Sequence, residues 1–175
     1  MFLHGLPNRD IATQIAGLIN DYNGLSAKRN GTAILQAQTD YVVETHGKLV
    51  LAAVGLNRDS YTLTEMKHLV VRPEWRKKGV AQFVAKRALA LVDTPMVYAT
   101  IREGNIASLR LFEKLGFVNS SEYPTKDHKV VLMTRAAPEW QKKSNQGWKP
   151  DLSFEETMDG IPDFSPMFES WMDDI

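Results

Sequence analysis

One stretch of the sequence, residues 62–91, constrains the fold more than any other. It opens with apolar and β-branched residues that end at Val71, and it continues through a short basic turn that ends at Gly79. Apolar residues then recur at offsets of three and four, which places them on one face of a helix. These apolar positions are Val80, Phe83, Val84, Ala88, Leu91 and Val92. A strand, a glycine-containing turn and a helix in this order predict an α/β domain.

The turn before this helix carries groups that can bind an anion. The first four N–H groups of a helix have no partner inside it, and the helix dipole adds partial positive charge there. Gly79 allows a close backbone approach, and Arg76, Lys77 and Lys78 add three positive charges. The turn therefore predicts a pyrophosphate site. An ordinary strand–helix turn with a solvated basic cluster is the alternative.

The turn does not match the two commonest nucleotide loops, because it lacks Gly-Lys-Ser/Thr and contains a single glycine. A second pattern lies further along the chain. Asn105 is suited to cap a helix and Gly116 is suited to end it. Between them, Ile106, Leu109, Phe112 and Leu115 share one helix face.

Together, the two patterns resemble the GNAT superfamily of N-acyltransferases. Residues 76–81 are similar to its acyl-CoA pyrophosphate loop, Arg/Gln-x-x-Gly-x-Gly/Ala, and residues 105–117 are similar to its motif N-x-x-(A/S)-x-x-L-(Y/F)-E-K-x-G-F. The resemblance covers residues 1–135. Residues 136–150 are linker-like, and residues 151–175 form a separate acidic tail that contains aromatic residues.

The resemblance implies a mixed α/β (α+β) fold, with a mostly antiparallel central sheet flanked by helices. In that family two central parallel strands splay apart, and here those strands would end near Val71 and Ile101. The residue patterns predict the same order of elements. They predict a short strand at residues 2–4, helices at 8–23 and 26–38 with a break near 30–31, a hairpin at 41–55, and a closing strand pair at 118–133.

The resemblance also implies which residues bind acetyl-CoA. Backbone groups at the end of the central strand would pair with the pantetheine amides, and N–H groups of the turn would hold the pyrophosphate. The cofactor-binding residues expected are Leu69, Val70, Val71, Arg76, Lys77, Lys78, Gly79, Val80, Ala81, Asn105 and Phe112.

Glu65 is the candidate general base. A lysine ε-amine has a pKa near 10.4, so a base must remove its proton before it attacks. Resemblance to the protein-acetylating branch implies a catalytic glutamate 11 positions before Arg76. An ion pair with Lys67 is the structural alternative for Glu65, and His68 is expected to be an ordinary strand residue rather than a proton relay.

The sequence departs from the family at Phe112. Many members carry a tyrosine there, which serves as general acid for the leaving thiolate, and phenylalanine has no proton to donate. Tyr98 and Tyr123 are the remaining candidates by their order in the chain. Solvent is the alternative proton source.

Composition excludes several classes of protein. The chain has no cysteine, which excludes disulfides and a thiolate nucleophile, and its four histidines lack metal-ligand spacing. The longest apolar run, residues 49–56, is too short to span a bilayer, and the N-terminus lacks the pattern of a secretory signal. We therefore expect a soluble cytoplasmic protein without a metal and without membrane partners.

Charge is distributed unevenly along the chain. Residues 151–175 contain eight acidic residues and no lysine or arginine, so the first 150 residues carry a net charge of +8. Acidic residues interleaved with aromatic ones are typical of a docking peptide. Such a tail would bind a protein partner, pack on its own domain, or contact a second copy in a homodimer.

The function expected is direct transfer of an acetyl group from acetyl-CoA to a primary amine, carried by a protein, a small molecule or a nucleotide. The alternative is a non-catalytic or weakly active GNAT-fold binding protein that acts through its acidic tail. Phe112 and the tail favour this alternative, whereas the intact pattern of Arg76, Gly79 and Ala81 argues against it.

Overall fold

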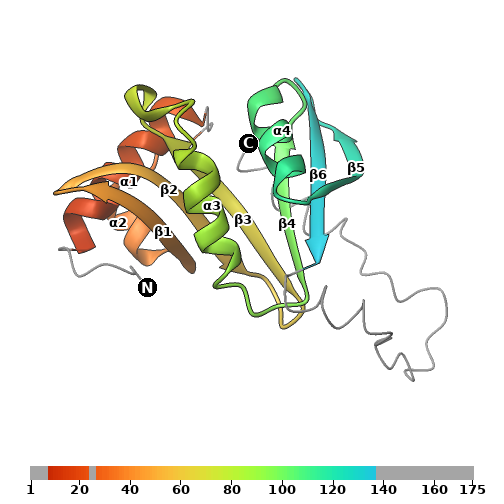
Figure 1. Ribbon diagram of the computed structural model, residues 1–175, viewed down its shortest axis with the longest axis horizontal. Helices are drawn as coiled ribbons and strands as arrows, with labels where there is room; N and C mark the ends of the chain where they lie inside the picture. The colour runs from red at the N-terminus through yellow and green to blue at the C-terminus, as the bar shows by residue number, and fades with distance from the viewer. Residues whose placement is uncertain (1–7, 24–26, 137–175) are drawn as a thin grey trace.

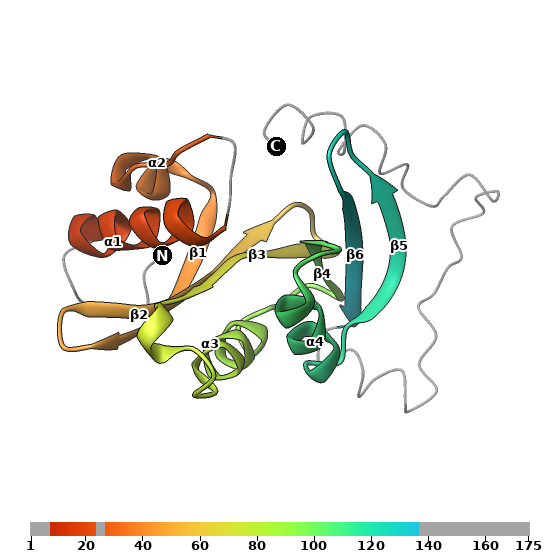
Figure 2. The same cartoon turned by 90° about the horizontal axis from the view of Figure 1, so that it is seen from above.

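The structure, a computed structural model, describes residues 8–23 and 27–136, which form one sheet covered by helices on both faces (Figures 1 and 2). In chain order the elements are α1 (Asn8–Tyr22), α2 (Gly31–Gln36), β1 (Thr39–His46), β2 (Leu49–Arg58), β3 (Leu63–Val71), a 3₁₀ turn η1 (Pro73–Trp75), α3 (Val80–Leu89), β4 (Met96–Arg102), α4 (Ile106–Lys114), β5 (Val118–Pro124) and β6 (Lys129–Ala136). The strand predicted at residues 2–4 and the acidic tail lie outside the described residues.

The sheet has six strands in the order β1-β2-β3-β4-β6-β5. Every neighbouring pair is antiparallel except β3 and β4, which are parallel. Helices α1 and α2 cover one face, and α3 and α4 cover the other (Figure 2). The predicted mixed, mostly antiparallel sheet flanked by helices is thus confirmed.

The parallel junction between β3 and β4 is short. Only three residue pairs join the two strands, and the last of them is Glu65 with Tyr98. Beyond this pair β3 stays paired with β2 across a bulge, and β4 stays paired with β6, so β3 and β4 diverge (Figure 1). The sheet therefore contains a gap that opens toward Val71 on one side and Ile101 on the other.

Two hydrophobic cores lie on the two faces of the sheet, because successive strand residues point to opposite faces. Helix α3 buries Val84 and Ala88, but it ends at Leu89, so the predicted continuation to Val92 is wrong. Phe83 is 53% exposed and lies under the guanidinium of Arg87, 5.6 Å from the ring centroid. The apolar pattern assigned Phe83 to the buried face of the helix. Its exposed position is explained by the guanidinium of Arg87, which covers the solvent side of the ring.

Two helix starts depend on asparagine caps. Asn105 Oδ1 accepts from Ser108 N at 3.2 Å, which confirms the predicted cap of α4. Asn30 Oδ1 accepts from Ala33 N at 2.8 Å, so residues 30–31 begin α2 rather than break a longer helix. No helix among the described residues is both long and apolar enough to cross a membrane.

Candidate active site

The turn that begins α3 has the geometry of an anion-binding loop. Gly79 has a φ of +79°, and Lys77 also has a positive φ, of +59°. The first helical hydrogen bond runs from Phe83 N to Gly79 O at 3.0 Å. The N–H groups of residues 80–82 therefore have no acceptor inside the helix, and a left-handed glycine directs them outward. This is the loop predicted at residues 76–81.

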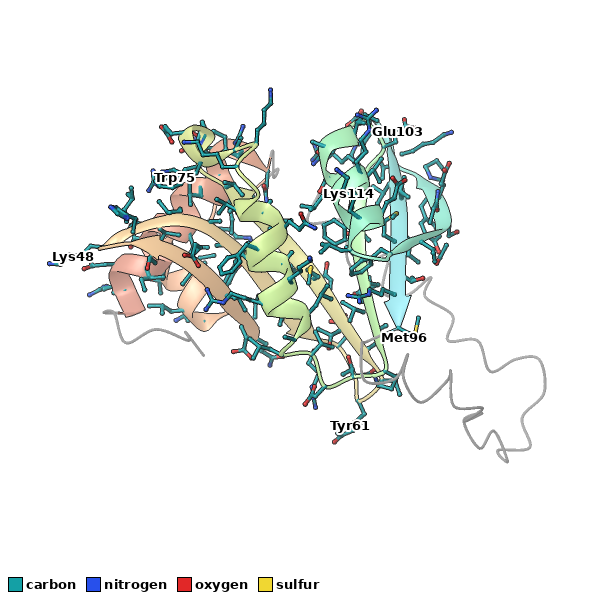
Figure 3. All side chains as sticks on the ribbon, in the orientation of Figure 1. Lys48, Tyr61, Trp75, Met96, Glu103 and Lys114 are labelled. Carbon is teal, nitrogen blue, oxygen red and sulfur yellow. The ribbon has the colours of Figure 1, made fainter. Side chains whose placement is uncertain are left out.

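The side chain of Arg76 is held by two elements of the domain. Its Nε donates to Val71 O at 3.0 Å, and its guanidinium lies 4.5 Å from the ring centroid of Tyr22 at the end of α1. Lys78 lies 5.0 Å from the ring centroid of Trp75 (Figure 3). Arg76 thus ties α1 and β3 to the loop, while Lys77 extends from the exposed part of the turn.

Alternate residues at the end of β3 face the gap. Arg72 N donates to Leu51 O at 2.8 Å, and Val70 lies opposite Ala53 of β2. Because backbone groups of a strand alternate in direction, those of Leu69 and Val71 point toward the gap, and those of Val70 point toward β2. Of the three residues predicted to contact pantetheine, the structure brings two to the gap.

Glu65 lies where β3 and β4 separate, and it is 2% exposed. Lys67 Nζ lies 3.0 Å from its Oε2, as the structural alternative for Glu65 predicted. Apart from this contact with Lys67, Oε2 has no hydrogen-bond partner among the described residues. Burial raises the pKa of Glu65 to about 7, although Lys67 opposes this shift. A carboxyl group with this pKa can accept a proton near neutral pH.

Tyr98, one of the two candidate acids, already donates its proton. Its hydroxyl donates to Asp59 Oδ2 at 2.6 Å, and Asn57 Nδ2 donates to Asp59 Oδ1 at 2.5 Å. Burial, the charge of Glu65 and the hydrogen bond to Asp59 together raise the pKa of Tyr98. Asp59 was missed because the sequence around it indicated only a turn. Tyr123 lies on β5, the edge strand of the sheet, and β6 separates it from β4 and the gap.

His68 occupies a bulge in β3, where its φ is +55°. Its Nδ1 lies 2.7 Å from the hydroxyl of Tyr41, and the two rings are stacked with a centroid distance of 6.1 Å. Burial lowers the pKa of His68 to about 3, so the imidazole is neutral at neutral pH. The sequence did not indicate this pairing with Tyr41. The pairing holds His68 in an unfavourable backbone conformation, three residues after Glu65 on β3.

We expect Tyr41→Phe to lower the free energy of unfolding by about 1–3 kcal/mol, because it removes a buried hydroxyl that is the hydrogen-bond partner of a half-buried imidazole. Wild-type stability should also fall as the pH drops from about 6.5 to about 3, since the unfolded chain binds a proton that native His68 rejects. Urea unfolding at several pH values measures both effects. Tyr61→Phe is the control, because Tyr61 is 90% exposed (Figure 3). Equal stability of the two variants would contradict the assignment.

The two predicted site residues of α4 differ in burial. Asn105 is exposed at the helix start, and its side-chain oxygen caps the helix. Phe112 is 2% exposed and packs edge-on against Phe117, with ring centroids 4.9 Å apart. Among the described residues, no group of three histidine, cysteine, aspartate or glutamate side chains is arranged to hold a metal ion.

Comparisons with known proteins agree with this geometry. A family model described as the acetyltransferase (GNAT) family matches residues 17–117. No curated protein matches the chain in sequence.

Solved structures with a similar fold include a variant of the spermidine N-acetyltransferase SpeG from Vibrio cholerae, with 20% identity over 79% of this chain and 96% of that chain and a TM-score of 0.64. Ard1 from Thermoplasma volcanium has 18% identity over 72% of this chain and 93% of that chain, with a TM-score of 0.61. An aminoglycoside 6'-N-acetyltransferase complexed with coenzyme A has 15% identity over 77% and 94%, with a TM-score of 0.64.

Proposed function

Because this chain belongs to the GNAT acetyltransferase family, we propose that it moves an acetyl group from acetyl-CoA directly onto a primary amine, with Glu65 as general base. The position of Glu65 carries the proposal. It lies in the last pair between β3 and β4, at the closed end of the gap, and the open end lies beside the turn that begins α3. A cofactor held by that turn and extended into the gap brings its thioester toward Glu65.

The residues that hold acetyl-CoA follow from the same geometry. The outward N–H groups at the start of α3 suit the pyrophosphate, with Lys77 and Lys78 adding positive charge. The gap-facing backbone groups of Leu69 and Val71 suit the pantetheine amides, although Arg76 already donates to Val71 O. Val71 would therefore contribute its N–H, and Arg76 would act mainly by shaping the turn.

In the proposed reaction the amine nitrogen attacks the thioester carbonyl, and the C–S bond breaks to release the CoA thiolate. Glu65 takes the proton that the amine loses, and Lys67 stabilises the carboxylate before this transfer. A backbone N–H of the Leu69–Val71 segment polarises the thioester oxygen. Holding both reactants in one gap supplies the proximity that the transfer needs.

Solvent protonates the departing thiolate in this proposal. Phe112 has no proton to give, and Tyr98 is committed to Asp59. A thiol has a pKa near 8.5, so a thiolate leaves without full protonation far more readily than an alkoxide does. The absence of a hydroxyl at Phe112 is also the observation that favours the second candidate function, a GNAT-fold protein that binds acetyl-CoA without turnover.

The proposed acceptor is a primary amine carried by a protein, a small molecule or a nucleotide. The names of the similar structures refer to spermidine and to aminoglycosides as acceptors of those proteins. Both are amines, which supports an amine acceptor here. We therefore propose a panel of polyamines, aminoglycosides and lysine peptides as the first acceptors to assay with acetyl-CoA.

The cofactor site can be tested by calorimetric titration of acetyl-CoA into the full-length protein. We expect Gly79→Ala to weaken binding roughly tenfold, because a left-handed conformation costs a residue with a Cβ about 1–2 kcal/mol. Relaxing that strain turns the N–H groups of the loop away from the pyrophosphate.

Gly47→Ala is the matched control for this titration. Gly47 also has a positive φ, of +58°, and in both glycines an added Cβ meets no atom within 4 Å. The two variants should therefore lose similar stability, but only Gly79→Ala should lose affinity. Tight binding by Gly79→Ala, or no binding by the wild-type protein, would refute the proposed cofactor site.

A further inference from the structure

A basic cleft lies at the opposite end of α3 from the proposed cofactor loop. It has a volume of about 420 Å³, and its lining includes Lys86, Leu89, Val92, Lys114, Leu115 and Arg135. Helix α3 has 10 residues, so the cleft lies roughly 15 Å from the loop. Three cations from α3, α4 and β6 surround a floor of buried leucine and valine side chains.

The cations of the cleft have no acidic partner among the described residues. Ion pairs between described residues include those of Arg58 with Asp93, Lys67 with Glu65, and Arg87 with Glu44, and none of them involves a cation of the cleft. Asp93, which is adjacent in sequence to Val92 of the cleft, is thus already paired. The charge of the cleft therefore remains uncompensated within this part of the chain.

Arg135 is the cation of the cleft that has an unsatisfied hydrogen-bond donor. Its Nε is buried and has no hydrogen-bond partner, and burial lowers the pKa of its guanidinium. The side chain packs on Gly116, where an added Cβ would lie 3.3 Å from Arg135 Nε. Lysines in the last turns of α3 and α4 also complement the helix dipoles, but Arg135 belongs to a strand and has no such role.

We propose that the basic cleft is the docking site of the chain's own acidic tail, residues 151–175. Charge complementarity is the first argument, because the tail has eight acidic residues and no lysine or arginine. Its apolar residues match the floor of the cleft in the same way. They include Phe154, Met158, Ile161, Phe164, Met167, Phe168, Trp171 and Met172.

The path of the chain is the second argument. Arg135 lines the cleft, and the described chain ends one residue later at Ala136, which pairs with Met96 at the start of β4 (Figure 3). Residues 137–150 connect this point to the tail, and a chain of that length extends at most roughly 50 Å. Attachment at this point keeps the tail at a high effective concentration beside the cleft.

Zero-length carbodiimide cross-linking of the full-length protein tests this proposal, because the reagent joins lysine amines to carboxylates in contact. We expect the tail to cross-link to Lys86 and Lys114. Lys149 is the positive control, since it precedes the tail in sequence. Lys48, at the tip of the β1–β2 hairpin far from the cleft, is the negative control (Figure 3). Peptide mass spectrometry identifies the links, and a mixture of isotope-labelled and unlabelled protein shows whether they lie within one chain.

A tail linked as readily to Lys48 as to Lys114, or linked to Lys149 alone, would overturn the proposal. Links that join labelled to unlabelled peptides in the proportion expected for random pairing of chains would also overturn it, and would assign the cleft to the tail of a second copy. An NMR experiment gives an independent readout. The indole N–H signal of Trp171 should shift in a Lys86→Glu/Lys114→Glu variant, but not in Lys48→Glu/Lys129→Glu, which changes net charge equally.

Discussion

Glu65→Gln lowers kcat by roughly 10²–10³-fold, the expected loss when a general base is removed. Affinity for acetyl-CoA should not change, because Glu65 lies at the closed end of the gap and in the proposed mechanism would contact the acceptor amine rather than the pyrophosphate. Glutamine has nearly the same shape, so the fold should be preserved. Steady-state kinetics with acetyl-CoA and the acceptor, alongside calorimetry, separates the two effects.

The pH dependence adds a second test of the same residue. Burial raises the pKa of Glu65 to about 7, and a base acts only in its deprotonated form. The kcat/KM of the wild-type protein should therefore increase with pH and level off above about 7, and this increase should be absent from the residual activity of Glu65→Gln. Glu44→Gln is the control, since the carboxylate of Glu44 lies on β1 and is paired with Arg87 of α3. Unchanged turnover in Glu65→Gln would exclude the proposed mechanism. Acetyl-CoA binding without turnover by the wild-type protein would favour the non-catalytic alternative.

Phe112→Ala has the largest expected effect on stability, a loss of about 3–5 kcal/mol in the free energy of unfolding. The ring is 2% exposed, contacts Phe117 edge-on, and belongs to the core between the sheet and the helices α3 and α4. Alanine leaves a cavity that such a core fills only in part. Urea unfolding monitored by circular dichroism measures the change.

Phe83→Ala is the matched control for this prediction. Phe83 also lies on a helix that packs on this face of the sheet, but it is 53% exposed. We expect the control to lose no more than about 1 kcal/mol. Similar losses in both variants would show that the core does not depend on Phe112, and its position would then be better explained by a direct role in the cofactor site.

Local signals account for most of the fold that the sequence predicted. Three of these signals depend only on residues close in sequence. They are Gly79 before the regularly spaced apolar residues of α3, Asn105 as the N-cap of α4, and the hairpin turn at Gly47. Backbone conformation and capping act over a few residues, so a sequence pattern reports them reliably. The resemblance to the family then supplied the central pair of parallel strands, which no local signal contains.

Contacts between distant residues could not be predicted in the same way. Arg76 stacks on Tyr22, and Tyr41 pairs with His68, yet each pair is brought together only by the packing of α1 and the sheet. Phe83 was predicted to be buried for the same reason. The spacing of apolar residues does not distinguish a buried ring from a ring that is covered by a cation. Glu65 was identified from sequence, but its pKa depends on burial that only the folded chain produces.

The three-pair junction of β3 and β4 divides the sheet into two mechanical blocks. One block consists of β1, β2 and β3, and the other of β4, β6 and β5. In an uninterrupted sheet, a continuous ladder of backbone hydrogen bonds would transmit force between two such blocks. Here the gap replaces most of that ladder. A molecule that hydrogen-bonded to both sides of the gap would therefore act as a seventh strand, and we expect its binding to stiffen the sheet where the fewest residue pairs join two neighbouring strands.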